Sequence, residues 1–198
     1  DAMELAGEPI HAINSGPSMA PIAGRYYASS ECTEPNAIVA DTGGTTYDVS
    51  LVRRGRIPKT RETWIDQPFR GHMTGFPSID IKSVGAGGGS IARVDDGGIL
   101  FVGPDSAGAD PGPVCYSAGG TMATLTDACL VLGYLDPDYF LGGALALDTR
   151  AAEAAIAEQI AAPLGLELAA AAAAIVEVAT ENMVQAITEI TVNQGIDP

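Results

Sequence analysis

The chain has 198 residues, 46% of them hydrophobic, which is enough for one good-sized domain or for a piece of a larger protein. The formal net charge of −15 is unevenly placed, because residues 1–93 carry nine Lys and Arg against ten Asp and Glu, whereas residues 94–198 carry Arg150 against fifteen acidic residues. This balance argues against a nucleic acid or an anionic membrane as a partner, since both require basic surface.

The three cysteines, Cys32, Cys115 and Cys129, are odd in number and show no CxxC spacing. They predict reduced and mostly buried thiols of a cytoplasmic protein rather than a disulfide framework or a zinc site. No signal peptide is visible, and the longest apolar run, residues 168–176, is too short to span a bilayer. Because the first residue is not methionine and the last four are GIDP, we expect a fragment of a longer protein.

In chain order, the first predicted element is a helix over residues 18–30. Asn14 or Ser15 would cap this helix, and Pro17 would lie near its first turn. Residues 34–36 then break the chain before an apolar run that predicts a strand.

Two predicted strands, residues 36–40 and 49–52, flank the octapeptide DTGGTTYD at residues 41–48. Its two glycines let the backbone approach a phosphate and point N–H groups at it, and its threonine hydroxyls add donors. Asp41 repels a phosphate but is suited to hold Mg²⁺ or the water shell of that ion. The alternative is a plain β-hairpin whose glycines only make the turn.

The second of these strands is predicted to run to Arg54, with a turn at Gly55 and another antiparallel strand over residues 56–66. Five of the ten basic residues fall here, and they predict a solvated outer face, with a partner subunit or a substrate anion as the alternative; they are Arg53, Arg54, Arg56, Lys59 and Arg61. Residues 67–78 predict a loop in which His72 lies at the surface.

A strand over residues 79–84 leads into a second glycine-rich turn, GAGGGS, at residues 85–90. This turn fails the dinucleotide-binding fingerprint, because Ser90 stands where the third glycine belongs and a β-hairpin over residues 91–102 follows in place of a helix. A strand, a glycine turn and a hairpin can still bring amides to a ligand. The candidate residues in this turn are Gly85, Gly87, Gly88 and Gly89.

Residues 103–120 predict a loop that is long for a passive connection, which favours a functional or interface role. Cys115 lies in this loop without a histidine near it in sequence, so we expect it to be structural rather than a nucleophile.

The rest of the chain is helical in pattern, and the three predicted helices run over residues 126–135, 148–165 and 166–193. Thr126 or Asp127 would cap the first helix, Asp148 or Thr149 would cap the second, and Gly165 would end the second.

Several stretches in this order resemble one known family. They are NSGP at residues 14–17, DTGGTTYDV at 41–49, GAGGGSI at 85–91, GPDSAGADPGP at 103–113 with CY at 115–116, and TDA at 126–128. The ordered set resembles the hydantoinase A / 5-oxoprolinase family, which also includes ATPase subunits of acetone and acetophenone carboxylases. The resemblance covers essentially the whole chain.

The resemblance implies an α/β fold of the ribonuclease H-like, actin-like ATPase type, with a mixed β-sheet, antiparallel hairpins and C-terminal helices. We expect residues 1–198 to be a single domain fragment, with strands and glycine loops over about 36–120 and helices over about 126–194. ATP and Mg²⁺ would bind between two such domains. Another phosphate loop and the adenosine-binding segment would lie outside this chain.

The implied function is part of an ATP-dependent cyclic amidohydrolase of the hydantoinase or 5-oxoprolinase type, in which ATP drives ring opening of a lactam or imide. Asp41 would be the catalytic, magnesium-side carboxylate, and Asp48 would brace the turn. The phosphate contacts would be Gly43, Gly44, Thr45 and Thr46, and the turn with Gly85, Gly87, Gly88 and Gly89 would lie near the nucleotide or shape the substrate side.

The implied partners are a nucleotide, a small cyclic amide substrate and a hydantoinase B-like subunit or domain. Two alternatives stand beside this function. One is the ATPase subunit of an acetone or acetophenone carboxylase-like enzyme, which would use the same phosphate chemistry on another substrate. The other is a non-catalytic scaffold, if the chain binds nothing by itself.

Overall fold

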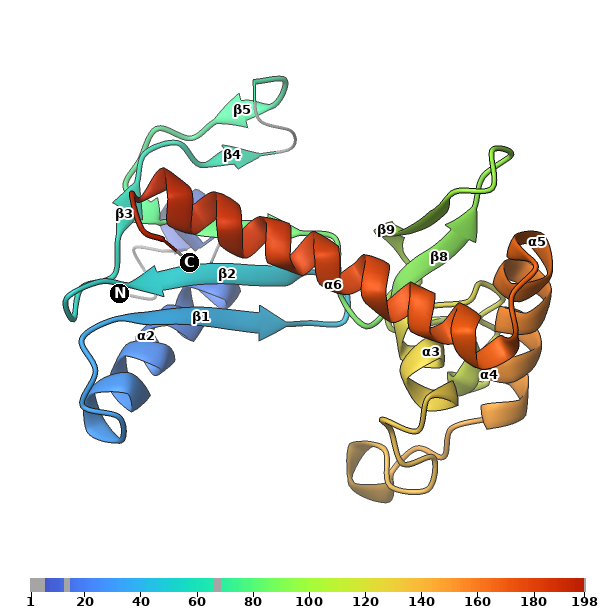
Figure 1. The fold of residues 1–198 in the computed structure, drawn as a ribbon. Helices are drawn as coiled ribbons and strands as arrows, with labels where there is room; N and C mark the ends of the chain where they lie inside the picture. Colours follow the sequence, from blue (N-terminus) through green and yellow to red (C-terminus); the bar gives the residue numbers. More distant parts are fainter. Residues whose placement is uncertain (1–5, 13–14, 66–68, 198) are drawn as a thin grey trace. The chain divides into compact units, whose positions relative to one another are not determined.

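The computed structural model describes residues 6–12, 15–65 and 69–197 of the chain (Figure 1). The chain divides into two compact units. The first unit comprises Asp1–Asp41, Asp48–Lys82 and Ile187–Pro198, and the second comprises Thr42–Tyr47 and Ser83–Ala186. The described residues form a mixed α/β fold with antiparallel hairpins and C-terminal helices, as predicted. A single domain over residues 1–198 stays a prediction.

The first unit combines one helix with short strands. Its elements are the 3₁₀ turn η1 (Pro9–Ala12), helix α2 (Ser15–Ser30) and the strands β1 (Ala37–Thr42), β2 (Tyr47–Val52), β3 (Lys59–Thr60), β4 (Trp64–Ile65), β5 (His72–Met73), β6 (Ser78–Ile79) and β7 (Ile81–Val84). The order of the three-stranded sheet is β1-β2-β7, and β1 and β2 run antiparallel (Figure 1). Two small antiparallel pairs, β3 with β6 and β4 with β5, stand beside it.

Helix α2 confirms the helix expected near residue 18, and it begins three residues earlier. Pro17 lies in its first turn, where the missing N–H costs no hydrogen bond. The expected cap at Asn14 lies outside the described residues. Gly24 packs so closely on Val39 of β1 that a side chain at Gly24 would collide with it. Absence of a side chain therefore lets the helix lie directly on the strand.

The strand predicted over residues 56–66 is wrong in extent. A tight turn with positive φ at Arg54 and Gly55 ends β2, and the backbone bridge between Arg53 and Arg56 closes that turn. Pro58 has no N–H to donate to a ladder, so the chain leaves the sheet there. The described part of residues 56–66 forms only β3 and β4, and these strands pair with β6 and β5 rather than with β2.

The second unit holds a hairpin and most of the helices. Its elements are β8 (Ser90–Val94), β9 (Leu100–Ser106), the 3₁₀ turns η2 (Val114–Tyr116) and η3 (Leu141–Gly143), α3 (Leu125–Val131), α4 (Thr149–Ile156), the π-helical turn η4 (Ala157–Ala161), α5 (Ala162–Leu164) and α6 (Leu168–Asn193), whose last seven residues belong to the first unit. The hairpin expected over residues 91–102 is confirmed. Asp95 shapes its turn by accepting the N–H groups of Gly97 and Ile99.

The core of the second unit lies between the β8–β9 hairpin and the helices α3, α4 and α6. Its fully buried side chains are Ala92, Ala123, Ala128, Ile156, Ile160, Ala171, Ala172 and Ile175. Small alanines on α6 let that helix approach its neighbours closely. The alanine-rich run of residues 168–176 is therefore mainly a packing surface.

Three of the predicted helix boundaries can be compared with the structure. Asp148 caps α4 by accepting the N–H of Ala151, and Gly165 ends α5 in the left-handed region, both as predicted. The cap predicted for the first of the three helices is wrong, because Thr124, not Thr126 or Asp127, is the N-cap of α3.

The π-helical turn η4 interrupts the helix that follows Asp148. Its residue Gln159 accepts a hydrogen bond from the N–H of Ala123 and donates one to the carbonyl of Thr121. A single side-chain amide thus holds the segment that leads into α3.

Within the described residues, no single helix is both long and apolar enough to cross a membrane. Only the pair Thr149–Leu164 and Leu168–Asn193 reaches the required length and hydropathy together, and these helices are bent by 86° at their junction.

Candidate functional site

The octapeptide at residues 41–48 joins β1 to β2. The N–H of Gly43 donates to the carbonyl of Thr46 at 2.8 Å, which closes the turn. Gly43, Gly44 and Thr45 are exposed at its tip, whereas Tyr47 is buried and anchors the returning strand. The turn is therefore a hairpin in form, and its tip is accessible to a ligand.

The two carboxylates of the octapeptide differ in environment. Asp41 is exposed near the end of β1. Asp48 is half-buried and interacts within the protein. An exposed carboxylate at a strand end can hold a hydrated cation, whereas a half-buried one with a partner is better suited to supporting the turn.

The second glycine-rich turn lies directly against the first. The N–H of Gly88 donates to the carbonyl of Gly43 at 3.0 Å, and the N–H of Gly89 donates to the carbonyl of Gly44 at 2.6 Å. Gly87 has no room for a side chain, because an added Cβ would lie 2.6 Å from the backbone C and N of Thr45. The structure thus brings together two turns that are more than forty residues apart in the sequence.

The N–H groups of residues 86–90 in the second turn are occupied by the protein. Five consecutive N–H groups donate to protein acceptors: Ala86 to Val84, Gly87 to the Ser90 hydroxyl, Gly88 to Gly43, Gly89 to Gly44 and Ser90 to Gly87. Ser90, which breaks the dinucleotide fingerprint, is fully buried and satisfies the N–H of Gly87. These N–H groups therefore hold the two turns together and are not available to a ligand.

The N–H groups at the tip of the first turn are in the opposite situation. Within the described residues, the N–H groups of Gly44 and Thr45 have no protein acceptor, and both residues are exposed. Two exposed backbone donors beside a threonine hydroxyl suit an anion such as a phosphate. This arrangement is the strongest candidate for a ligand site in the part of the chain that the structure describes.

Asp127 is a buried carboxylate that the sequence pattern assigned only to capping. It completes a capping box with Thr124 and accepts the N–H groups of Val114 and Cys115 as well. The hydroxyl of Thr124 donates to the same carboxylate at 2.7 Å. One side chain therefore joins the start of α3 to the loop that precedes it. A short-range capping signal could suggest the first role but not the second.

Cys115 is fully buried, as the structural interpretation expects. Burial raises the pKa of its thiol, and the negative charge of Asp127 raises that pKa further. Burial also raises the pKa of Cys129. Both thiols are therefore poor sources of the reactive thiolate.

We expect Cys32 alone to react rapidly with a thiol reagent in the native chain at pH 8, because Cys32 is exposed whereas Cys115 is buried, Cys129 is half-buried and both have raised pKa values. Titration with Ellman's reagent, before and after addition of denaturant, would measure this. Denaturant should make all three thiols reactive. Rapid modification of Cys115 in the native chain would contradict its structural role.

Within the described residues, no group of three or more His, Cys, Asp and Glu side chains is arranged to hold a metal ion. A magnesium ion that accompanies a nucleotide needs only one or two protein carboxylates, because phosphate oxygens and water supply its other ligands. Asp41 is chemically suited to that smaller task.

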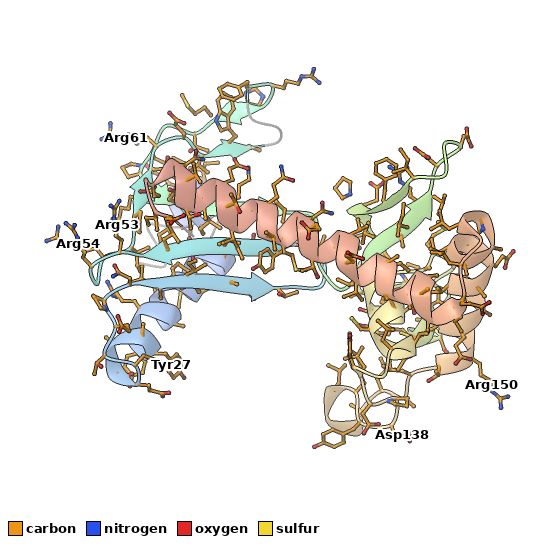
Figure 2. All side chains as sticks on the ribbon, viewed as in Figure 1. Tyr27, Arg53, Arg54, Arg61, Asp138 and Arg150 are labelled. Atoms are coloured by element: carbon orange, nitrogen blue, oxygen red, sulfur yellow. The ribbon has the colours of Figure 1, made fainter. Side chains whose placement is uncertain are left out.

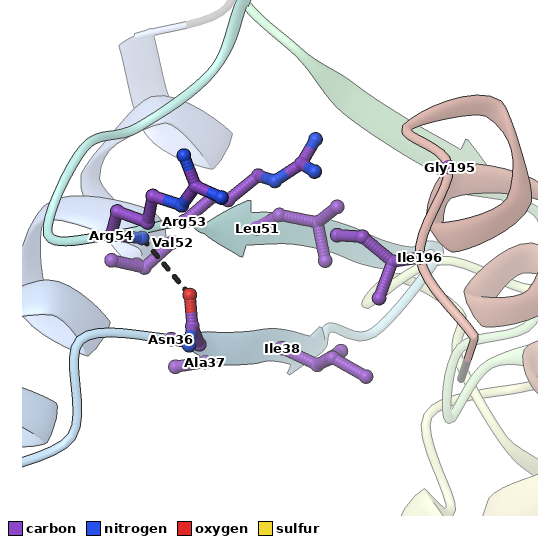
Figure 3. A pocket seen from close by; sticks show the side chains of 9 residues that line it. All are labelled: Asn36, Ala37, Ile38, Leu51, Val52, Arg53, Arg54, Gly195 and Ile196. Carbon is purple, nitrogen blue, oxygen red and sulfur yellow. Dashed lines mark hydrogen bonds between the residues drawn. The ribbon is translucent and has the colours of Figure 1, made fainter.

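A second feature, in the first unit, is an apolar cavity of about 480 Å³ (Figure 3). Its apolar lining residues are Ala37, Ile38, Leu51, Val52 and Ile196, and Arg53 and Arg54 line it as well. The side chain of Arg53 donates to the carbonyl of Gln194, and the N–H of Arg54 donates to Asn36. Sequence patterns could not reveal this cavity, because three separate segments form it.

The five basic residues between positions 53 and 61 are exposed, and Arg53, Arg54 and Arg61 extend outward from the strands (Figure 2). Their exposure agrees with the solvated outer face expected for them and equally with the alternative of a partner subunit or a substrate anion. His72 is exposed as well, although it lies in β5 rather than in a loop.

The chain thus combines a mixed α/β fold with two glycine turns that are hydrogen-bonded to each other, and comparison with known proteins identifies its family. Residues 1–198 match the family model described as hydantoinase/oxoprolinase. The chain belongs to this family, which confirms the resemblance found in the sequence.

Two relatives illustrate the similarity. The alpha subunit of caprolactamase from Pseudomonas jessenii is 44% identical over 189 residues, a match that covers 96% of this chain and 26% of the relative. The gamma subunit of acetophenone carboxylase from Aromatoleum aromaticum is 44% identical over 187 residues. This match covers 93% of this chain and 25% of the relative. The chain therefore spans about a quarter of the length of these relatives, both of which are named as subunits.

Two solved structures have a similar fold. The ATP-dependent caprolactamase from Pseudomonas jessenii matches with a TM-score of 0.83 and 44% identity, covering 94% of this chain and 26% of that chain. The nucleotide-free acetone carboxylase matches with a TM-score of 0.83 and 35% identity. This match covers 93% of this chain and 25% of that chain.

Proposed function

We propose that this chain supplies a phosphate-binding loop to an ATP-dependent enzyme that opens a cyclic amide, of the hydantoinase or 5-oxoprolinase type. The observation that carries the proposal is the exposed tip of the first glycine turn, where the N–H groups of Gly44 and Thr45 have no acceptor within the described residues. Membership of the hydantoinase/oxoprolinase family supports it.

Several residues of the first glycine turn would contact the phosphate groups. The N–H groups of Gly44 and Thr45 and the hydroxyls of Thr45 and Thr46 would donate to phosphate oxygens, and Gly43 would allow the close approach. Asp41 would hold the magnesium ion or its water shell. Bound ATP would supply the phosphoryl group whose transfer makes hydrolysis of an unactivated cyclic amide favourable.

Asp48 would brace the turn, in keeping with its half-buried position. For Gly85, Gly87, Gly88 and Gly89 we propose support of the first turn in place of direct contact with the nucleotide, because the N–H groups of residues 86–90 donate to the protein and the carbonyl of Gly85 accepts from the Ser90 hydroxyl.

The longer protein would complete the site. We propose a ribonuclease H-like fold of the actin-like ATPase type, with the other phosphate loop and the adenosine-binding segment in regions outside these residues. A hydantoinase B-like subunit or domain would be the partner, and the free cysteines fit a cytoplasmic location. Similarity to solved chains about four times as long supports a site divided in this way.

A second function is favoured by a specific observation. The acetophenone carboxylase gamma subunit is as similar to this chain, at 44% identity, as the caprolactamase alpha subunit is. The chain would then be part of the ATPase subunit of a ketone carboxylase, and the same turn would bind the same phosphates.

The deciding experiment is ATP hydrolysis by the full-length protein with its partner subunit, in the presence of 5-oxoproline, hydantoins, caprolactam, or a ketone with bicarbonate. Stimulation by a cyclic amide supports the first function, and stimulation by a ketone supports the second. Absence of nucleotide binding by the full-length protein in calorimetry would contradict both. For the isolated chain of 198 residues we expect weak binding of Mg·ATP or none.

We expect Asp41→Ala in the full-length protein to lower kcat/KM for ATP hydrolysis by about 100-fold, since it removes the carboxylate that would hold the magnesium ion, and that ion balances the charge of the phosphates. The melting temperature should change little, because Asp41 is exposed. Asp96→Ala is the matched control, since Asp96 is also an exposed aspartate but lies in the β8–β9 turn. Equal activities of the two variants would remove Asp41 from the site.

A further inference from the structure

We infer that Thr126, near the start of α3, is a positioning residue that sets the direction of the free N–H groups in the first glycine turn. It acts through the second turn and touches no ligand itself. This inference rests on the proposed function, because it concerns the loop that would bind phosphate.

The first link joins α3 to the second turn. Both the N–H and the hydroxyl of Thr126 donate to the carbonyl of Gly88, at 2.9 and 2.8 Å. Thr126 is buried, so water competes little for this carbonyl. Two donors on one carbonyl oxygen restrain the orientation of the peptide group to which it belongs.

The second link follows from peptide geometry. The carbonyl of Gly88 and the N–H of Gly89 belong to one planar trans peptide group, so they point in opposite directions. Thr126 holds the carbonyl side, and the N–H side donates to the carbonyl of Gly44 at 2.6 Å. Any rotation of this peptide group would break the bonds on both sides.

The third link applies the same geometry to the first turn. The carbonyl of Gly44 shares its peptide group with the N–H of Thr45, and the carbonyl of Gly43 shares its peptide group with the N–H of Gly44. Both carbonyls accept from the second turn. The two unpartnered N–H groups must therefore point away from the second turn, toward the side that a ligand can approach.

Thr126 is well placed for this task because its own position is fixed independently. It lies between the N-cap Thr124 and the buried Asp127, which together form the capping box of α3. Its backbone N–H also bonds to Gly88, so loss of the hydroxyl would loosen the link without removing it. The second glycine turn thus fixes the backbone conformation of the first.

The test compares three variants of the full-length protein. Thr126→Val removes the hydroxyl and keeps the branched shape, Thr126→Ser keeps the hydroxyl, and Thr180→Val removes an exposed hydroxyl bond within α6 as a control. The first readout needs no nucleotide. It is hydrogen exchange, measured by mass spectrometry, in peptides that cover residues 41–48 and 84–90.

In Thr126→Val we expect exchange in these two peptides to become about fivefold faster, the change that corresponds to one neutral hydrogen bond. We expect KM for Mg·ATP to rise by a similar factor while kcat is retained, because the loop holds phosphate in the ground state and the transition state alike. Thr126→Ser should restore both values, and Thr180→Val should alter neither.

Unchanged exchange in Thr126→Val would overturn the inference. So would equal effects of the Val and Ser variants, accompanied by faster exchange throughout α3 and the β8–β9 hairpin, since that pattern marks a general loss of stability. If the exchange pattern is as expected but the unmodified full-length protein binds no Mg·ATP, the link between the turns stands and the proposed function fails.

Discussion

Replacing Gly87 by alanine is expected to weaken binding of Mg·ATP to the full-length protein by tenfold or more. The added Cβ would lie 2.6 Å from the backbone C and N of Thr45 and 2.7 Å from the carbonyl oxygen of Gly43. These neighbours are backbone atoms, so no side chain can rotate to make room. Overpacking of this kind costs about 1–3 kcal/mol.

The first turn is the part that should move, because its tip is exposed whereas Gly87 is buried between two occupied amides. A displaced turn would lose the alignment of its two free N–H groups. A loss of about 1.4 kcal/mol corresponds to the tenfold weakening. Most of the penalty should therefore appear in binding rather than in the melting temperature.

Calorimetric titration of Mg·ATP into the full-length protein and the Gly87→Ala variant would measure the effect. Gly7→Ala is the control, because Gly7 is exposed and an added Cβ there meets no atom within 4 Å. Equal affinities of Gly87→Ala and the unmodified protein would show that the contact between the turns does not shape the binding loop.

The second large effect is expected for Asp127→Asn, which should lower the free energy of unfolding by about 2–4 kcal/mol, on the scale of hydrogen bonds to buried charged groups. Asp127 has no exposed surface and accepts from Val114, Cys115 and Thr124. Asparagine has nearly the same shape but replaces one acceptor oxygen by an NH₂ donor. That donor would face N–H groups at a position that has no surface exposed to solvent.

Urea denaturation monitored by circular dichroism would measure the loss. Asp148→Asn is the matched control, because Asp148 is an exposed helix cap and asparagine caps a helix as well as aspartate does. An Asp127→Asn variant as stable as the control would mean that the buried carboxylate contributes little. The two variants carry the same change of charge, so net charge cannot explain a difference between them.

The parts of the fold that follow from local signals were predicted well. The β8–β9 hairpin, the cap at Asp148, the left-handed Gly165 and helix α6 each depend on residues within one or two turns of one another. The strand expected over residues 56–66 was wrong because partner choice in a sheet is a long-range property, which Pro58 only hints at.

The candidate site shows the same limit. The sequence indicates two glycine-rich turns, but their hydrogen bonds join Gly43 and Gly44 to Gly88 and Gly89, and no local pattern records that pairing. The roles of Thr126 and Asp127 were hidden for a related reason. Each residue matches a helix-start signal, and such a local signal contains no information about contacts with distant loops.

The π-helical turn Ala157–Ala161 has a consequence for how the chain tolerates changes of length. A π turn holds about one residue more than an α turn. Deletion of one residue there would restore a regular α-helix and leave the residues on either side on their present faces, because an α turn covers the same rotation with one residue fewer. Ala157 and Glu158 are the exposed residues of this turn, whereas Gln159 bonds to Thr121 and Ala123 and Ile160 lies in the core. Deletion of Ala157 or Glu158 should therefore be tolerated better than deletion of one residue in the regular helix α6, where the residues that follow would rotate by about 100°.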